Sequence, residues 1–214
     1  LEDLKTIALS YANAQNRIVT KQDAAARVYT MPSNLGRVYR VGFRPNPANV
    51  LSTLMYIVSR NENGQLVIST DTLKINLSKY LNEFRLISDA IDIVDSPIVN
   101  LQVNYTVTLR STAIKNTTLQ QINQSLKEYF NIKNFQIDQG ILTSDIMNII
   151  LNKEGVISVN NLTLEGINGT INGTEYSDVI FNVKQNTLNG IVIPPPGGIF
   201  EVRYPDFDII GNVS

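Results

Sequence analysis

The clearest hydrophobic pattern lies between residues 98 and 109. From Val99 onward, apolar side chains alternate with polar ones up to Leu109. A period of two is typical of a strand that has one buried face and one wet face. We therefore predict a long strand from Ile98 to Leu109, with Val103, Tyr105 and Val107 facing a core.

Two amphipathic helices and a returning strand are predicted next. The first helix has one apolar stripe, at Leu119, Ile122, Leu126 and Tyr129. The second runs from Ser144 to Lys153, buries Ile146, Ile149 and Ile150, and stops at Gly155. This spacing fits helices that each cover a core with one face. Val156–Val159 and Leu162–Leu164 are predicted to bring the chain back as strands.

The first hundred residues show the same mixture of periods. Leu4, Ile7 and Tyr11 predict a short helix from Leu1 to Ala14. Thr20 and Asp23 are typical of a capping box, which predicts a helix from Lys21 to about Tyr29. Strands at 37–43, 51–59 and 66–69, a helix from residue 71 or 72 to about 84, and a strand at 90–94 complete this part.

The last fifty residues change character. Residues 166–173 are rich in Asn, Gly and Thr, which predicts a loop, and residues 178–183 and 189–193 predict a hairpin. Pro194–Gly198 predicts a stiff turn, and the alternating residues 199–204 predict a last strand.

These elements predict an α+β fold, with two small sandwich modules whose helices pack on mostly antiparallel sheets. We expect four regions: an N-terminal helix and lead-in segment (1–19), a first α+β module (20–96), a second α+β module (97–166) and a C-terminal β-rich extension (167–214). The chain starts with Leu1 instead of Met, so we expect it to be a fragment of a longer protein.

Composition narrows the chemistry. The 214 residues are 43% hydrophobic and carry a net charge of −1, so the basic surplus of a nucleic-acid-binding protein is missing. There is no His and no Cys, which removes the commonest general base and every thiolate site. No apolar run is long enough to cross a bilayer. We predict no enzyme, no cofactor, no metal, no nucleic acid and no membrane contact.

Acidic residues form two groups that deserve a test. Asp89, Asp92 and Asp95 are three apart, but they lack the spacing of a calcium loop, and a strand would send them to opposite faces. Glu201, Asp206 and Asp208 are the acids that a hydrolase would use. For both groups a solvated loop or edge is the simpler interpretation.

Four arginines, Arg37, Arg40, Arg44 and Arg60, form a local basic cluster, which is either an ordinary surface or a contact for an acidic partner. Arg17 stands beside a helix cap in an extended segment, where we expect it to tie the chain to a carboxylate or to carbonyl groups.

One segment has a family resemblance. Tyr11-Ala12-Asn13-Ala14 followed by Gln15-Asn16-Arg17-Ile18-Val19-Thr20-Lys21-Gln22-Asp23 resembles the start of this region in baseplate J-like proteins, which include the large wedge subunit of T-even-like contractile-tailed phages. The order of elements up to Leu164 is similar as well. Ala24 stands where the family usually has an aromatic residue.

The resemblance implies the C-terminal part of a structural subunit of the inner baseplate ring. Such a subunit would take part in the rearrangement that triggers sheath contraction. The implied partners are a second copy, other wedge proteins and the lysozyme-like, sheath-initiating subunit, and the implied location is the virion tail, assembled in the host cytoplasm. A carbohydrate-binding or receptor-binding tail adhesin is the alternative, although the chain has no Trp. The candidate interface residues are Leu4, Ile7, Tyr11, Arg17, Ile191, Val192, Ile193 and Pro194.

Overall fold

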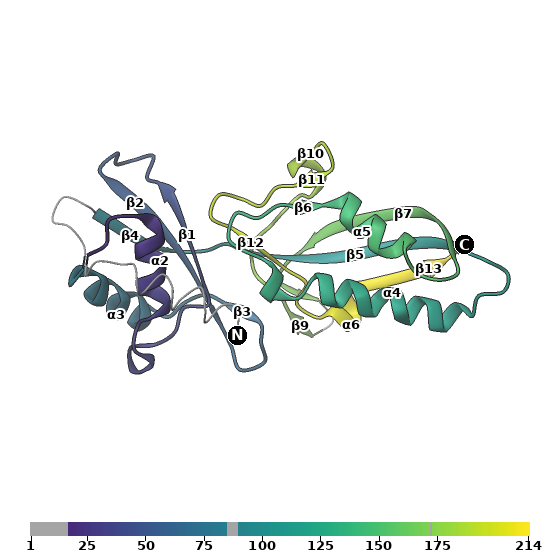
Figure 1. Cartoon of the computed structure of the whole chain (residues 1–214), viewed down its shortest axis with the longest axis horizontal. Coiled ribbons are helices and arrows are strands. Elements are labelled where there is room, and N and C mark those ends of the chain that lie inside the picture. The colour runs from purple at the N-terminus through teal and green to yellow at the C-terminus, as the bar shows by residue number, and fades with distance from the viewer. Residues whose placement is uncertain (1–16, 85–89, 172) are drawn as a thin grey trace. The chain divides into compact units, whose positions relative to one another are not determined.

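The computed structural model describes residues 17–84, 90–171 and 173–214 (Figure 1). It divides into two compact units, Leu1–Ser96 and Pro97–Ser214. The fold is mixed α+β with mostly antiparallel strand pairs, as the sequence predicted. Its helices are α2 (Lys21–Tyr29), α3 (Asp71–Asn82), α4 (Lys115–Tyr129), α5 (Thr143–Leu151) and α6 (Pro205–Asp208). Within the described ranges, none of these helices has the length and apolarity that a membrane span requires.

The first unit is built around strand β2. Its strands are β1 (Arg40–Pro45), β2 (Ser52–Arg60), β3 (Leu66–Val67) and β4 (Ala90–Asp95). β1 and β3 pair with β2 antiparallel, whereas β4 pairs with β2 in parallel. A parallel neighbour requires a crossover, and α3 supplies it. Lys74 of α3 then donates a hydrogen bond to Asp95 of β4 at 2.8 Å.

The core of the first unit lies between α2, α3 and one face of the sheet. Met55 and Ile57 of β2 are fully buried there, together with Leu77 of α3. α2 begins as the sequence predicted. The Thr20 side chain accepts from Asp23 N at 3.1 Å, and Asp23 Oδ2 accepts from Thr20 N at 2.8 Å. This capping box satisfies two amide groups that the first turn leaves free.

The second unit is built around strand β5. Its strands are β5 (Ile98–Leu109), β6 (Ile141–Leu142), β7 (Val156–Ile167), β8 (Thr170–Ile171), β9 (Thr174–Glu175), β10 (Thr187–Leu188), β11 (Ile191–Val192), β12 (Ile199–Glu201) and β13 (Ile209–Val213). β7 pairs antiparallel with one side of β5. β12 and β13 both pair in parallel with the other side. Residues 167–214, which the sequence set apart as an extension, therefore supply two strands to this sheet.

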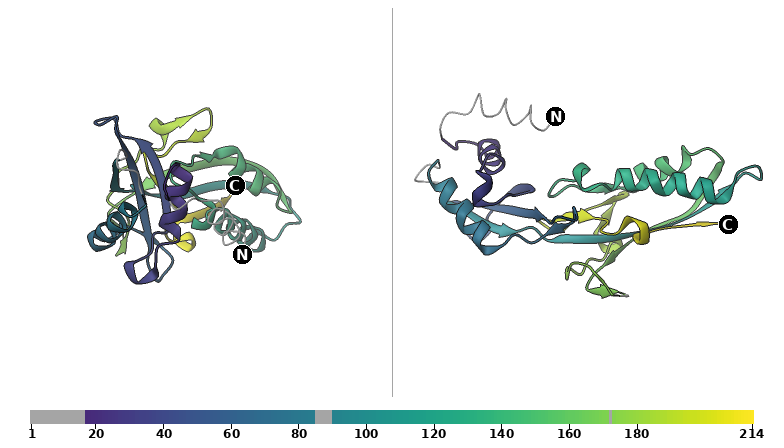
Figure 2. Two further views of the ribbon diagram at one scale, coloured as in Figure 1. Left: turned by 60° about the vertical axis from the view of Figure 1, so that its left-hand side comes forward. Right: turned by 90° about the horizontal axis from the view of Figure 1, so that it is seen from below.

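Helices α4 and α5 lie on one face of the second sheet (Figure 2, right). Val103, Tyr105 and Val107 of β5 are buried on that face. Tyr105 Oη donates to Asn123 Oδ1 of α4 at 2.7 Å, so the ring bridges sheet and helix. Gly211 of β13 lies directly against that ring, where a Cβ atom would collide with Tyr105.

Three details correct the sequence prediction. Residues 178–183 form no strand, and the hairpin is instead β10–β11. β13 was missed. The two predicted strands at 156–164 are one strand, whose pairing with β5 shifts register twice, between Thr106 and Val107 and between Thr108 and Leu109. These bulges interrupt the alternation of apolar and polar residues by which a strand is recognised in the sequence, so one strand was predicted as two.

Candidate functional site

A small three-stranded sheet in the second unit exposes an apolar face. β11 lies between β10 and β6, so Leu188, Ile191 and Leu142 are register partners, as are Thr187, Val192 and Ile141. Directly paired residues point to the same side of a sheet. Val192 and Ile141 are fully buried. The other row, with Leu188, Ile191 and Leu142, is exposed.

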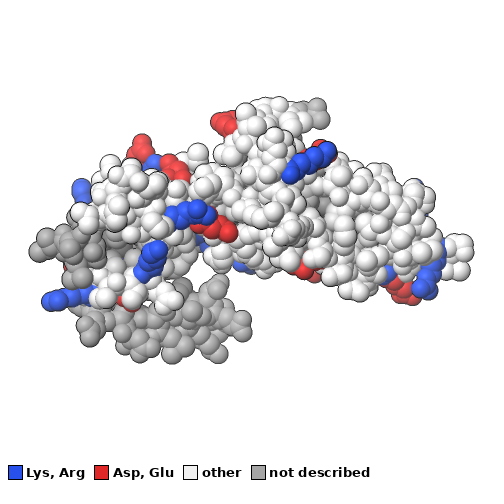
Figure 3. Space-filling view, turned by 90° about the horizontal axis from the view of Figure 1, so that it is seen from above, with Lys and Arg blue, Asp and Glu red and all other residues white. Residues whose placement is uncertain are grey.

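Ile193 continues this exposed row, because it lies two residues beyond Ile191. We call Leu142, Leu188, Ile191 and Ile193 the apolar face. Their exposed fractions run from 37% to 63%. Figure 3 shows a side of the molecule on which the second unit carries few charged side chains. Clustered aliphatic side chains with this exposure are typical of a protein–protein contact.

The apolar face is held firmly on the second unit. Thr143, the first residue of α5, donates to Gly190 O from its amide at 2.9 Å and from its hydroxyl at 3.0 Å. Gly140 lies under Ile191, and a Cβ there would come 2.8 Å from Ile191 Cγ2. The turn of the hairpin uses Asn189 and Gly190, both with positive φ, of 51° and 77°. The face is therefore presented by a rigid hairpin.

The predicted interface residues are distributed as follows. Ile191 and Ile193 belong to the apolar face, whereas Val192 and Pro194 are buried beneath it. Arg17 is exposed in the first unit. Leu4, Ile7 and Tyr11 lie outside the described residues. Leu142 and Leu188 were missed, although Asn189-Gly190 is a strong hairpin signal that would have placed Leu188 opposite Ile191.

The acids that a hydrolase would need do not converge. Glu201 and Asp208 are almost fully buried. Glu201 Oε2 accepts from Asn100 Nδ2 at 2.8 Å and lies 4.0 Å from Arg203 Nη1. Asp206 is exposed and pairs with Lys127 of α4. Two of the three carboxylates are thus committed to the interior of the unit.

Asp208 fixes the chain around α6. It accepts from Tyr176 Oη at 2.7 Å and from Tyr204 N at 2.8 Å. Burial raises the pKa of the Asp208 carboxyl, and these two hydrogen bonds oppose that rise. Burial, followed by the hydrogen bond to Asp208, raises the pKa of Tyr176 as well. This pair ties the segment before β10 to the segment before β13.

The other candidate charges also have local partners. Asp92 accepts from Asn46 Nδ2 at 2.9 Å, Asp95 binds Lys74, and Asp89 lies outside the described residues. Within residues 17–84, 90–171 and 173–214, no three acidic side chains gather in a way that could hold a metal ion. In the basic cluster, Arg40 and Arg60 both lie over the Tyr39 ring, at 4.4 Å and 5.4 Å from its centroid.

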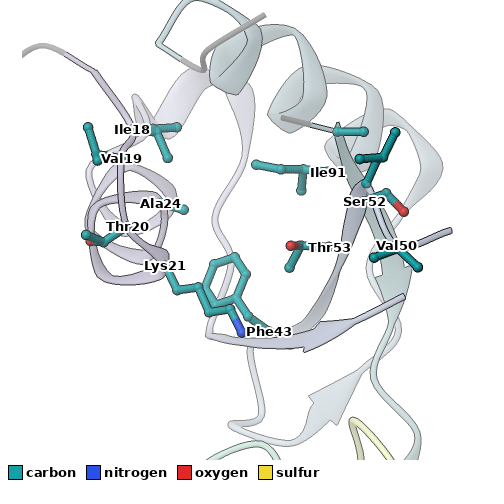
Figure 4. A pocket seen from close by; sticks show the side chains of 12 residues that line it. Ile18, Val19, Thr20, Lys21, Ala24, Phe43, Val50, Ser52, Thr53 and Ile91 are labelled. Atoms are coloured by element: carbon teal, nitrogen blue, oxygen red, sulfur yellow. The ribbon is translucent and has the colours of Figure 1, made fainter. Parts of the chain in front are cut away.

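The first unit has a pocket of about 410 Å³ beside the start of α2 (Figure 4). Its lining is mainly aliphatic, with Phe43, Ile91, Thr53 and Lys21 among the side chains that surround it. Lys21 is the charged group among its described lining residues. The pocket therefore offers apolar contact and no acid–base pair.

Two comparisons with known proteins found baseplate proteins. Residues 101–184 match the family model described as the Baseplate J-like protein C-terminal domain. A chain in the cryo-EM structure of the anti-feeding prophage (AFP) baseplate, 6-fold symmetrised, has a similar fold, with a TM-score of 0.52 and 11% sequence identity. The match covers 99% of this chain and 40% of that chain. The search of curated proteins found no match. The resemblance to baseplate J-like proteins is thereby confirmed, and the family model falls on the second unit.

Proposed function

We propose that this chain is a structural component of a contractile-tail baseplate. In this proposal it forms part of the inner wedge ring and takes part in the rearrangement that triggers sheath contraction. It would act as a virion protein assembled in the host cytoplasm, with no catalytic step of its own. The apolar face is the single observation that carries the proposal, because a rigid, exposed aliphatic surface is suited to permanent docking.

Three further features support this role. The family match and the similar fold both come from baseplate proteins. The two buried acids of the second unit, Glu201 and Asp208, are hydrogen-bonded to side chains of the same unit, which suits a rigid body better than a reaction centre. An adhesin has less support, because among the described residues each unit has a single exposed aromatic side chain, Tyr29 in the first unit and Phe207 in the second.

The implied partners are a second copy of the chain, other wedge proteins and the lysozyme-like, sheath-initiating subunit. Of these, we assign the apolar face to a different baseplate protein. The four residues of the apolar face lie on one hairpin and on the strand beside it. Substitution there should weaken docking while the unit stays folded.

The test uses the organism that produces the particle. Its gene for this protein is deleted and then restored as wild type, as Leu188→Asp or as the matched control Ile114→Asp. Ile114 is 72% exposed at the start of α4, away from the apolar face. Electron microscopy of purified tails should show baseplates with wild type and the control, but not with Leu188→Asp. Complete, contracting tails in the deletion strain would contradict the proposal.

A further inference from the structure

The hydrophobic core of the first unit is open at one end. Met55 and Ile57, on the inner face of β2, are fully buried. Thr53 comes two residues before Met55 and so points to the same face, but it is half-buried. Its register partner Ile91 on β4 is half-buried as well. Both residues line the pocket of about 410 Å³, which is therefore the unfinished end of this core.

Exposed aliphatic side chains surround the same pocket. Val19 comes just before α2 and is 64% exposed. Val50 and Leu51 come from the turn between β1 and β2 and are 96% and 79% exposed. Figure 4 shows Val19 on the helix side of the pocket and Val50 on the strand side. A small molecule inside the pocket would leave these side chains in water, so they favour a larger, protein occupant.

The turn that carries Val50 and Leu51 is already ordered. Asn49 Oδ1 accepts a hydrogen bond from Leu51 N at 3.0 Å. Asn46 Nδ2 donates to Asp92 Oδ2 of β4 at 2.9 Å, which ties the turn to the far side of the sheet. The turn does not have to lose conformational freedom when an occupant binds, and this lowers the entropic cost of binding.

Two cations near the pocket have no acidic partner in the described part of the chain. Lys21, in the first turn of α2, lies beside the Phe43 ring (Figure 4). Arg17 directly precedes the lining residue Ile18 and is exposed. The ion pairs between described residues include neither side chain. Asp23, the acid closest in sequence, is committed to the capping box of α2. A carboxylate on the occupant would therefore be attracted to this end of the pocket.

We propose that the pocket binds a segment of a different baseplate protein, one that presents aliphatic side chains and a carboxylate. The aliphatic side chains would complete the open core between Val19 and the Val50–Leu51 turn, and the carboxylate would pair with Lys21. A second copy related by a two-fold axis does not fit, because the same hollow would face itself and two hollows cannot fill each other. This inference rests on the proposed function, since it names a docking surface within the same assembly.

The first test maps the occupant in purified tails. Benzoylphenylalanine, a photo-crosslinking residue, replaces Val50, and mass spectrometry identifies the linked peptide. Ile75 is 54% exposed on α3 and does not line the pocket, so the same replacement there is the matched control. Position 50 should link to one segment of another tail protein, with aliphatic residues and an acid within one helical turn, and position 75 should not. No link, a link within this chain or to a second copy, or a segment without an acid would overturn the proposal.

A synthetic peptide of the linked segment then tests the contacts on the full chain. Leu51→Asp should weaken its binding at least tenfold, whereas Ile75→Asp should not, and circular dichroism verifies that each variant is folded. Lys21→Glu should weaken binding at least fivefold at low salt, and a peptide whose acid is replaced by Lys should recover it. Lys79→Glu, at an exposed lysine in the last turn of α3, is the control. A charge-reversed peptide that gains nothing with Lys21→Glu would exclude the ion pair and overturn the proposal.

The two proposals fail separately. If Leu188→Asp abolishes baseplates while position 50 links to nothing, the docking at the pocket is wrong and the assembly role stands. If the deletion strain makes complete, contracting tails but the link at position 50 forms and follows the charge reversal, the assembly role is wrong and the docking stands.

Discussion

The two units arrange their strands alike around a central strand but complete the sheet by different routes. β2 and β5 each have an antiparallel neighbour on one side and a parallel neighbour on the other. In the first unit the parallel strand β4 returns through α3. In the second, β12 comes from so far along the chain that Asn100 and its partner Glu201 are 101 residues apart. The same layout is thus reached once by local and once by distant contacts.

The polar contacts that hold the parallel strands differ accordingly. Lys74 and Asp95, which join α3 to β4, are partly exposed. Asn100, Glu201 and Asp208 in the second unit are buried. A buried polar group costs free energy when its partner is removed, whereas an exposed ion pair contributes little. We therefore expect the second unit to be the more sensitive to single polar substitutions.

The largest expected effect is at Asn100. Asn100→Ala removes the donor to Glu201 and the acceptor that binds Ser177 N at 2.7 Å, so the buried Glu201 and the half-buried amide of Ser177 each lose a hydrogen bond. The free energy of unfolding should fall by about 3 kcal/mol. Lys74→Met in the first unit is the matched comparison and should cost at most about 1 kcal/mol. Urea unfolding measures both, and equal losses would remove the contrast between the units.

Gly211→Ala tests the contact between β13 and the core. The new Cβ would collide with the Tyr105 ring, which is buried and bonded to Asn123. Overpacking of this kind should lower the free energy of unfolding by about 2 kcal/mol. The double variant Gly211→Ala with Tyr105→Leu should lose less than the sum of the two single variants, because the collision is absent. Additive losses would mean that the ring is not the obstacle.

Thr20→Ala tests the local side of the comparison. It removes the cap of α2 and should lower the free energy of unfolding of the first unit by about 1 kcal/mol. Thr20→Ser keeps the hydroxyl and should retain most of the stability. Hydrogen exchange followed by mass spectrometry should show faster exchange in α2, with β5 unchanged. Faster exchange in β5 as well would show that the units do not unfold separately.

The smallest expected effects are on the pH dependence of stability. One carboxyl group in each unit, Asp23 in the first and Asp208 in the second, makes this dependence change in opposite directions. The backbone amide of Thr20 holds the pKa of Asp23 below its ordinary 3.8, so its contribution is present above that value and is lost as pH falls. Burial raises the pKa of Asp208 above 3.8, so its contribution is greatest below that value and is lost as pH rises through the raised pKa. Asp23→Asn and Asp208→Asn should therefore change the slope of stability with pH in opposite directions. Asp206→Asn, an exposed neighbour, is the control for Asp208→Asn.

Elements that depend on local pattern were predictable. The strand from Ile98 to Leu109 and the helix from Lys21 to Tyr29 occur where the sequence predicted them. The signals for both, alternating apolar and polar residues and a capping box, depend only on residues close together in the sequence. Part of the candidate site was predictable for the same reason. Ile191 and Ile193 belong to the apolar run 191–194 that the sequence shows, and both are on the apolar face.

What the sequence alone determined is where the longer helices and the central strands lie and which face of each is apolar. The tertiary structure decided which strands become neighbours. It placed Leu142, Leu188 and Ile191 in one row, set β13 against β5, and buried Val192 and Pro194. The physical reason is that a helix makes its backbone hydrogen bonds and caps within one segment of the chain. A strand makes its hydrogen bonds with another segment, and no local sequence pattern shows how far along the chain that partner lies.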